Sequence, residues 1–364
     1  MKILNLIQCA NLGGMEQASL RLMRSLQARG HELQLLSLNP IGGLGPLLQA
    51  AGIPHRGLPY AGRGGWRILP SLHQKLHDCG SDALIMTGHH LLAMPALGDF
   101  ARGRRILAIH FHHAGVKPEW QWRLIYRLAC SRFQAITFPA DFIRCEAERI
   151  YPPVAALAHT IRNPLYMPAL PTPEQKCAAR QALGLPPGVP IVGNAGWLIP
   201  RKRFDVFLRT AAAVAARCPD TRFVIAGDGA ERIRLQAMAA SLNLAGRVTW
   251  TGWLENMETF YQSLDVLLFN SDWDAMPTTP LEAMSHGVPV VASLVNGGLK
   301  EILASPECGF LLDRHDPETL AAAVADLLQN PATAANVSRA ARERVRVASD
   351  PEAIAIQHEQ LWRQ

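Results

Sequence analysis

The chain has 364 residues, of which 49% are hydrophobic and 18% charged, a composition that excludes bulk disorder and provides for about two domains. Its net charge of +6 is uneven, because residues 1–165 carry 18 Lys and Arg against 9 Asp and Glu, whereas residues 166–364 carry 18 against 21. A basic first half indicates an anionic partner, such as a phosphorylated substrate or a membrane surface, although uneven charge without functional meaning is the alternative. The sequence shows no Lys/Arg run and no nucleic-acid-binding motif, so nucleic acid is not an expected partner.

The start of the chain superficially resembles a lipoprotein signal that ends at Cys9. Its apolar run is too short, and Gln8 stands where a small residue is expected, so a buried first strand is predicted instead. No stretch offers about 18 consecutive apolar residues, which predicts no membrane span. The seven cysteines show no metal-ligand spacing, as expected for reduced thiols in a cytoplasmic protein.

Strands and helices alternate along the first 165 residues. A buried strand is expected at 3–7, followed by a glycine turn, a helix from Glu16 that ends at Gly30, and a second strand at 31–38. The same pattern recurs, with expected strands at 83–87, 105–109 and 134–138. This alternation is typical of a doubly wound parallel sheet.

Prolines cluster between residues 163 and 190, which indicates an interdomain linker with a short helix inside it. A second series follows, with expected strands at 190–195, 222–226, 248–251, 266–270, 288–292 and 309–312. We therefore expect an α/β protein of two tandem Rossmann-like domains that face a central cleft. The expected division is residues 1–165 and 166–350, with 351–364 as a C-terminal helix that packs back on the first domain.

The segment 270–292 carries the strongest chemical signal. It reads as a strand, a loop and a helix, with Asp274 on the loop and Glu282 inside the helix. Pro280 fits the first helical turn, whose free N–H groups favour a phosphate. Ionised carboxylates can accept hydrogen bonds from vicinal sugar hydroxyls. On spacing alone, a turn residue and a solvated helix residue remain the alternative.

This segment resembles the E-x7-E signature of the family-four retaining glycosyltransferases, which have the two-domain GT-B fold. Other segments match that family in the same order along nearly the whole chain: Gly13-Gly14-Met15-Glu16, Ile161-Arg162-Asn163-Pro164, and residues 196–205, 223–229, 248–253 and 295–302. Four positions depart from the family pattern: Asp274 replaces the first Glu, Trp197 an Arg, Arg203 a Gly and Pro164 a Gly.

The resemblance implies a retaining transferase that uses a nucleotide diphosphate sugar, a UDP- or GDP-sugar, with no cofactor and no catalytic metal. It implies that Arg201 and Lys202 stabilise the departing diphosphate, that Glu282 holds the ribose and that Asp274 holds the donor sugar. His110 falls where the family often has a histidine near that sugar; a plain strand-end histidine, or a metal site with His112, are the alternatives. The expected donor-binding residues are Gly13, Gly14, Gly196, Gly252, Trp253, Met276, Pro277, Thr278, Thr279 and Glu282.

The basic first domain is expected to bind a glycan or lipid-linked acceptor, as in lipopolysaccharide or other cell-surface polysaccharide biosynthesis. Between residues 117 and 127, Trp122 and Tyr126 share one helical face, and Arg123 and Arg127 share another. Such a helix suits peripheral contact with anionic lipid on the inner face of the cytoplasmic membrane, or else an ordinary core position. A nucleotide-sugar epimerase and a non-catalytic nucleotide- or sugar-binding protein are the competing functions.

Overall fold

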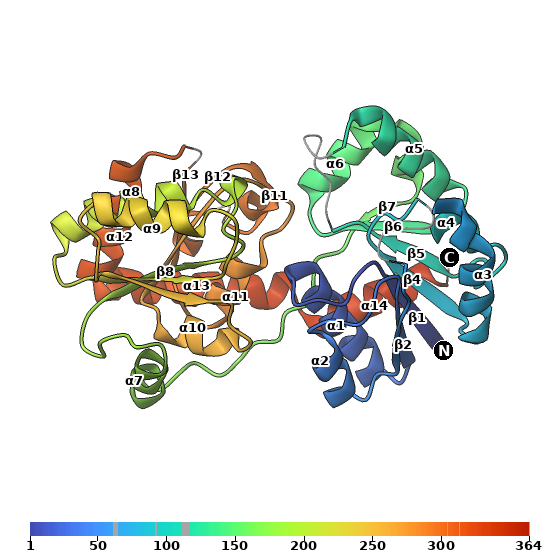
Figure 1. Cartoon of the computed structure of the whole chain (residues 1–364), viewed down its shortest axis with the longest axis horizontal. Helices are drawn as coiled ribbons and strands as arrows, with labels where there is room; N and C mark the ends of the chain where they lie inside the picture. Colours follow the sequence, from blue (N-terminus) through green and yellow to red (C-terminus); the bar gives the residue numbers. More distant parts are fainter. Residues whose placement is uncertain (61–64, 92, 111–116, 304, 313, 364) are drawn as a thin grey trace. The chain divides into compact units, whose positions relative to one another are not determined.

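The computed structural model describes residues 1–60, 65–91, 93–110, 117–303, 305–312 and 314–363. The chain forms two compact units, Met1–Tyr166 with Ser349–Gln364, and Met167–Ala348. Each unit is a parallel sheet with helices packed against it (Figure 1). Among the described residues, no helix is both long enough and apolar enough to cross a bilayer.

The first unit is built on a seven-stranded parallel sheet in the order β3-β2-β1-β4-β5-β6-β7. Its strands are β1 (Lys2–Ile7), β2 (Glu32–Ser37), β3 (His55–Gly57), β4 (Ala83–Thr87), β5 (Arg105–Ala108), β6 (Ala135–Phe138) and β7 (Ala158–Thr160). Its helices are α1 (Gly14–Ala28), α2 (Gly45–Ala50), α3 (Leu69–Asp78), α4 (Ala93–Ala96), α5 (Glu119–Cys130), α6 (Asp141–Ile150) and α14 (Pro351–Leu361), with 3-10 turns at Gly65–Ile68 and Pro152–Ala156. The first strand is buried from Ile3 onward, as the sequence predicts.

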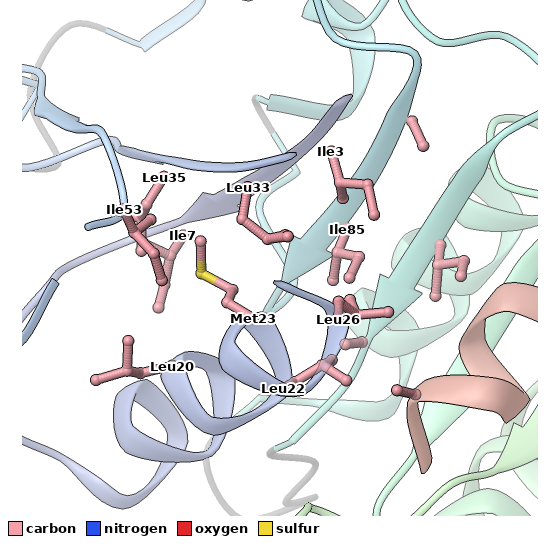
Figure 2. Close-up of a cluster of buried hydrophobic side chains, with 14 of the residues drawn as sticks. Ile3, Ile7, Leu20, Leu22, Met23, Leu26, Leu33, Leu35, Ile53 and Ile85 are labelled. Carbon is pink, nitrogen blue, oxygen red and sulfur yellow. The ribbon is translucent and has the colours of Figure 1, made fainter. Parts of the chain in front are cut away.

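The C-terminal helix α14 completes the core of the first unit although it is the last element of the chain. It packs on α1, and Ile354 of α14 belongs to the same apolar cluster as α1 residues. Figure 2 shows Met23 and Leu26 of α1 in this cluster. At the edge of this cluster, the Glu359 carboxylate accepts a 2.6 Å hydrogen bond from Arg29 Nε and lies 3.0 Å from His31 Nε2. The last helix is therefore held by apolar burial and by a charged bond network together.

The second unit has a six-stranded parallel sheet in the order β10-β9-β8-β11-β12-β13. Its strands are β8 (Ile191–Ala195), β9 (Arg222–Ala226), β10 (Val248–Gly252), β11 (Val266–Asp274), β12 (Val290–Gly297) and β13 (Phe310–Leu312). Its helices are α7 (Pro173–Ala182), α8 (Phe204–Arg217), α9 (Arg232–Ser241), α10 (Met257–Ser263), α11 (Thr278–Ser285), α12 (Pro317–Gln329) and α13 (Pro331–Ala348), with 3-10 turns at Pro200–Lys202, Gly298–Glu301 and Pro306–Cys308. Both strand orders are those of a doubly wound fold, so the predicted fold class is confirmed.

The predicted end of one strand is wrong. The sequence places Asp274 on a loop after a strand at 266–270, but β11 continues through Asp274. The extension pairs with β12, where Asp274 lies opposite Gly297. Residues 271–274 resemble a loop in composition, but Ser271, Trp273 and Asp274 pair with residues of the neighbouring strand.

Candidate active site

The site in the second unit begins where β8 ends. A 3-10 turn at Pro200–Lys202 follows the strand, and Arg203 connects it to α8 with a φ of 48°, in the left-handed region. This short connection brings two cations, Arg201 and Lys202, to the carboxyl edge of the sheet, beside the end of β11.

Three of the predicted catalytic side chains meet there. Lys202 Nζ donates a 2.6 Å hydrogen bond to Asp274 Oδ2, and Arg201 Nη1 lies 3.7 Å from Asp274 Oδ1. Ser271 Oγ donates a further 3.2 Å bond to Asp274 Oδ2. The Lys202 and Asp274 side chains are only 15% and 16% exposed, so the carboxylate is fixed beside its cations at a nearly buried position.

The N-terminus of α11 follows directly after Asp274. Pro277 stands at the N-cap position and makes no side-chain hydrogen bond to the first helical turn, which includes the N–H groups of Thr278 and Thr279. Thr279 Oγ1 donates a 3.3 Å bond to the carbonyl of Ala195, which joins the start of α11 to the end of β8. The side chains of Met276 and Pro277 are buried, so they fix the turn before α11 and are not themselves exposed at the site.

Glu282 lies one turn further along α11. Its carboxylate accepts a 2.7 Å hydrogen bond from the hydroxyl of Tyr261, a buried residue of α10. The His286 ring lies 5.1 Å from the Tyr261 ring, and burial lowers the pKa of His286. Sequence reasoning missed Tyr261, because a tyrosine in an apolar helix gives no signal beyond core packing.

Two exposed tryptophans lie at the same edge of the sheet. Trp197 follows β8 and Trp253 follows β10, and their ring centroids are 4.7 Å apart. Gly252, before Trp253, has a φ of 71°, and Gly196, before Trp197, has a φ of 150°. The two positive φ values explain glycine at these turns, and the turns place the two rings together.

A network of polar side chains connects the elements that carry this site, and the sequence analysis did not predict it. Arg203 Nη1 bonds to Asp272 Oδ1 at 2.9 Å, and His315 Nε2 lies 2.9 Å from the same oxygen. His315 Nδ1 in turn lies 2.7 Å from Ser293 Oγ, which accepts a 2.8 Å bond from Asn270 Nδ2. The network therefore joins the start of α8 to the end of β11 and to β12.

The predicted site residues of the first unit have a different setting. Gly13 caps α1, and a Cβ there would lie 2.3 Å from Glu16 Oε2, so a larger residue would displace this buried carboxylate. Gly14 is the first residue of the helix. The Cys9 thiol donates a 3.2 Å bond to Glu16, and burial beside this carboxylate raises the pKa of Cys9 to about 11.

His110 follows β5, and its Nδ1 is buried with no hydrogen-bond partner among the described residues. Burial lowers the pKa of His110 to about 4, so its ring is neutral at pH 7. It lines a small cavity of about 20 Å³ with Thr87, Thr137, Asn163 and His358, enough space for about one water. His112 lies outside the described residues.

Comparison with known proteins identifies the family. Residues 175–344 match the family described as glycosyl transferases group 1, and residues 13–164 match the glycosyl transferase 4-like domain. A GDP-mannose-dependent alpha-(1-6)-phosphatidylinositol monomannoside mannosyltransferase of Mycolicibacterium smegmatis is 30% identical over 68% of this chain and 67% of its own length. The lipopolysaccharide core biosynthesis mannosyltransferase LpsB of Rhizobium meliloti is 29% identical over 58% of this chain and 62% of its own length.

Solved structures agree on the fold. The Anabaena protein HepE, crystallised with UDP and glucose, superposes with a TM-score of 0.86 over 99% of this chain and 98% of its own, at 19% identity. WaaG, a glycosyltransferase involved in lipopolysaccharide biosynthesis, superposes with a TM-score of 0.73 over 98% of each chain, at 15% identity. The chain belongs to the group 1 glycosyltransferases, and it is an enzyme of that class with the GT-B fold.

Proposed function

We propose that this protein transfers a sugar from a UDP- or GDP-sugar to a glycan or lipid-linked acceptor, with retention of anomeric configuration. The observation that carries this proposal is the cluster of Arg201, Lys202 and Asp274 beside the open N-terminus of α11. A diphosphate leaving group needs cations and N–H donors, and a sugar needs a fixed carboxylate. The cluster provides cations, N–H donors and a carboxylate close together at the carboxyl edge of the second sheet.

In this proposal the donor is held along the carboxyl edge of the second sheet. Glu282, oriented by Tyr261, binds the ribose hydroxyls, and the backbone of Met276–Thr279 binds the phosphates and the sugar. The Trp197 and Trp253 rings offer the base an apolar stacking surface. The HepE structures with UDP and with UDP and glucose support a nucleotide-sugar donor for this fold.

The chemical step needs no enzyme nucleophile and, in this proposal, no catalytic metal. The acceptor hydroxyl oxygen bonds to the anomeric carbon on the face that the leaving group departs from, and the bond from that carbon to the phosphate oxygen breaks. The hydroxyl proton passes to a phosphate oxygen, so the nucleotide leaves as its diphosphate. Lys202 and Arg201 stabilise the negative charge that develops on that diphosphate.

A thermal-shift panel with UDP, GDP, ADP and CMP tests the donor site. A ligand at about 100 times its Kd adds roughly 2.7 kcal/mol to stability, which gives a clear rise in Tm. We expect one nucleotide to raise the Tm of the wild type and of the control Lys176→Ala, but not that of Lys202→Ala or Glu282→Ala. Lys176 forms a similar 2.7 Å ion pair, with Asp265, outside the site. If no nucleotide raises the wild-type Tm, the donor assignment is wrong.

Turnover assays separate the competing functions. Transfer only when an acceptor is present supports the transferase, whereas conversion of the donor sugar without any acceptor indicates an epimerase. Nucleotide binding without transfer to any glycan or lipid-linked acceptor would contradict the proposed acceptor class. The acceptor class is proposed from the relatives, one named for phosphatidylinositol monomannoside and another for lipopolysaccharide core.

We further propose that α5 makes peripheral contact with the inner face of the cytoplasmic membrane. Trp122 and Tyr126 are fully buried, so that face of the helix belongs to the core. The opposite face exposes Trp120 (64%) and Leu124 (47%) beside Arg123 and Arg127. Apolar side chains flanked by arginines suit an anionic lipid surface.

Vesicle flotation tests this contact. We expect the wild type to float with vesicles rich in phosphatidylglycerol and not with pure phosphatidylcholine. The double variant W120S/L124S should lose most of this binding, whereas Ile233→Ser, which changes an equally apolar but 82% exposed side chain of the second unit, should retain it. Equal flotation of both variants would contradict the role of α5.

A further inference from the structure

Helix α3 carries two histidines one turn apart, neither of which is assigned to donor chemistry. His73 and His77 lie on the same face of the helix, with their ring centroids 4.5 Å apart. Asp99, in the connection from α4 to β5, places its Oδ1 3.2 Å from His77 Nε2. One potential ligand atom from each of these three residues lies within 4.8 Å of the other two.

The His73 ring is already oriented as a metal ligand would be. Its Nδ1 lies 2.9 Å from the backbone carbonyl of Ala96. A carbonyl only accepts, so Nδ1 carries the proton and Nε2 keeps a free lone pair. A ligating histidine usually donates its other ring N–H to a carbonyl or carboxylate in this manner.

The chain around Asp99 is shaped to the same ring. Gly98 has a φ of 47°, and a Cβ there would lie 2.7 Å from His73 Cε1. A larger residue at this position would displace the His73 ring.

We propose that His73, His77 and Asp99 form a Zn²⁺ site, with water completing the coordination. Two imidazoles and one carboxylate are typical zinc ligands, whereas Mg²⁺ and Ca²⁺ prefer oxygen donors. With bonds of about 2.0–2.1 Å, tetrahedral ligand atoms lie about 3.3 Å apart. The 3.2 Å between His77 Nε2 and Asp99 Oδ1 already fits that geometry. The bound ion would join α3 to the connection that follows α4, within the first unit and independently of donor binding.

A zinc titration against a chromophoric chelator, on the full chain, tests the site. We expect the wild type to bind one Zn²⁺ and to rise in Tm with Zn²⁺ but not with Mg²⁺. His77→Gln and Asp99→Asn each remove one ligand and should weaken binding at least tenfold. Asp78→Asn is the matched control, because Asp78 lies on the same helix and bonds to Gln74 outside the cluster. It should bind zinc as the wild type does.

Three results would overturn the proposal. The wild type could bind no zinc, or both ligand variants could bind it with unchanged affinity, which would place the ion elsewhere, for example on thiols. An equal Tm rise with Mg²⁺ would show a general ionic effect. The His77 and Asp99 side chains are 39% and 76% exposed, so both variants should fold, and their Tm without zinc checks this directly.

Discussion

Lys202 Nζ donates a 2.6 Å hydrogen bond to Asp274, so the fold itself positions the cation. We expect Lys202→Ala to raise the barrier for transfer by about 3 kcal/mol or more, because a preorganised charge partner of the leaving group is lost. Initial rates at saturating donor and acceptor measure this loss in kcat. Lys176→Ala should retain the wild-type rate, and normal turnover by Lys202→Ala would remove the proposed role.

Arg203 combines a strained backbone with a useful side chain. Its left-handed φ of 48° costs an ordinary residue about 1 kcal/mol, but its guanidinium bonds to Asp205 at 3.0 Å and to Asp272 at 2.9 Å. Both Arg203→Ala and Arg203→Gly lose these bonds, and only glycine also relieves the strain. We therefore expect the glycine variant to be about 1 kcal/mol more stable than the alanine variant in urea unfolding. Equal stabilities would show that the backbone there is not strained.

The sequence predicts the site residues that belong to a short motif. It does not predict the residues that support them from elements far away along the chain. Arg201, Lys202 and Asp274 were identified from matched segments, and the structure brings them together. The partners that orient the site, such as Tyr261 for Glu282 and His315 for Asp272, lie in other elements. Only the folded sheet brings these side chains into contact, so no spacing along the chain could indicate them.

At the scale of the element, the pattern of apolar residues in the sequence predicts the positions of the central strands correctly, but it predicts some strand ends incorrectly. The predicted strands at 83–87 and 222–226 match β4 and β9, because both are short apolar runs with clear flanks. The three-residue edge strands β3 and β7 were not predicted, since they are too short to show a period. The end of β11 depends on pairing with β12, which composition does not reveal.

The carboxylate of Glu359, near the end of α14, contributes to the packing of this helix on the first unit. Bonds from Arg29, with a smaller contribution from His31, lower the pKa of Glu359 to about 2 from an ordinary 4.5. A lowered carboxyl pKa stabilises the fold above pH 4.5, by up to about 3 kcal/mol for a side chain only 10% exposed, and this contribution is lost as the pH falls from 4.5 toward 2. We expect Glu359→Gln to lower the unfolding free energy at pH 7 by up to that amount, measured by urea denaturation.

The pH dependence of Glu359 ionisation provides a control for the Glu359→Gln variant. As the pH falls from 4.5 toward 2, the wild-type carboxyl takes up a proton and becomes about half protonated at its folded pKa, so the difference in stability between the two proteins should shrink. Glu352→Gln serves as a matched substitution on α14. Glu352 also pairs with Arg29, but its side chain is exposed and the distance to Arg29 Nη1 is 3.4 Å. It should change stability little. A constant difference between wild type and Glu359→Gln at every pH would mean that packing, and not charge, holds the helix.

At the scale of the whole molecule, the two units differ in how they should respond to acid. Burial lowers the pKa of His90, His110 and His358 to about 4, and all three belong to the first unit. In the described part of the second unit, His286 is the histidine with a lowered pKa. Each of these three histidines is neutral in the folded protein between pH 6.5 and 4 but takes up a proton when the chain unfolds, so the unfolded state binds more protons in that window.

Stability of the first unit should therefore fall as the pH drops from 6.5 to 4, by up to about 3 kcal/mol for each of the three histidines. This window lies above the one in which Glu359 titrates, so at about pH 5 the histidines dominate. We expect calorimetry to show two transitions that separate on acidification, with that of the first unit moving down further. His358→Gln removes one titrating group and should reduce the pH dependence of that transition by about one proton, while leaving the other transition unchanged. Parallel shifts of both transitions would show that the buried histidines do not control acid stability.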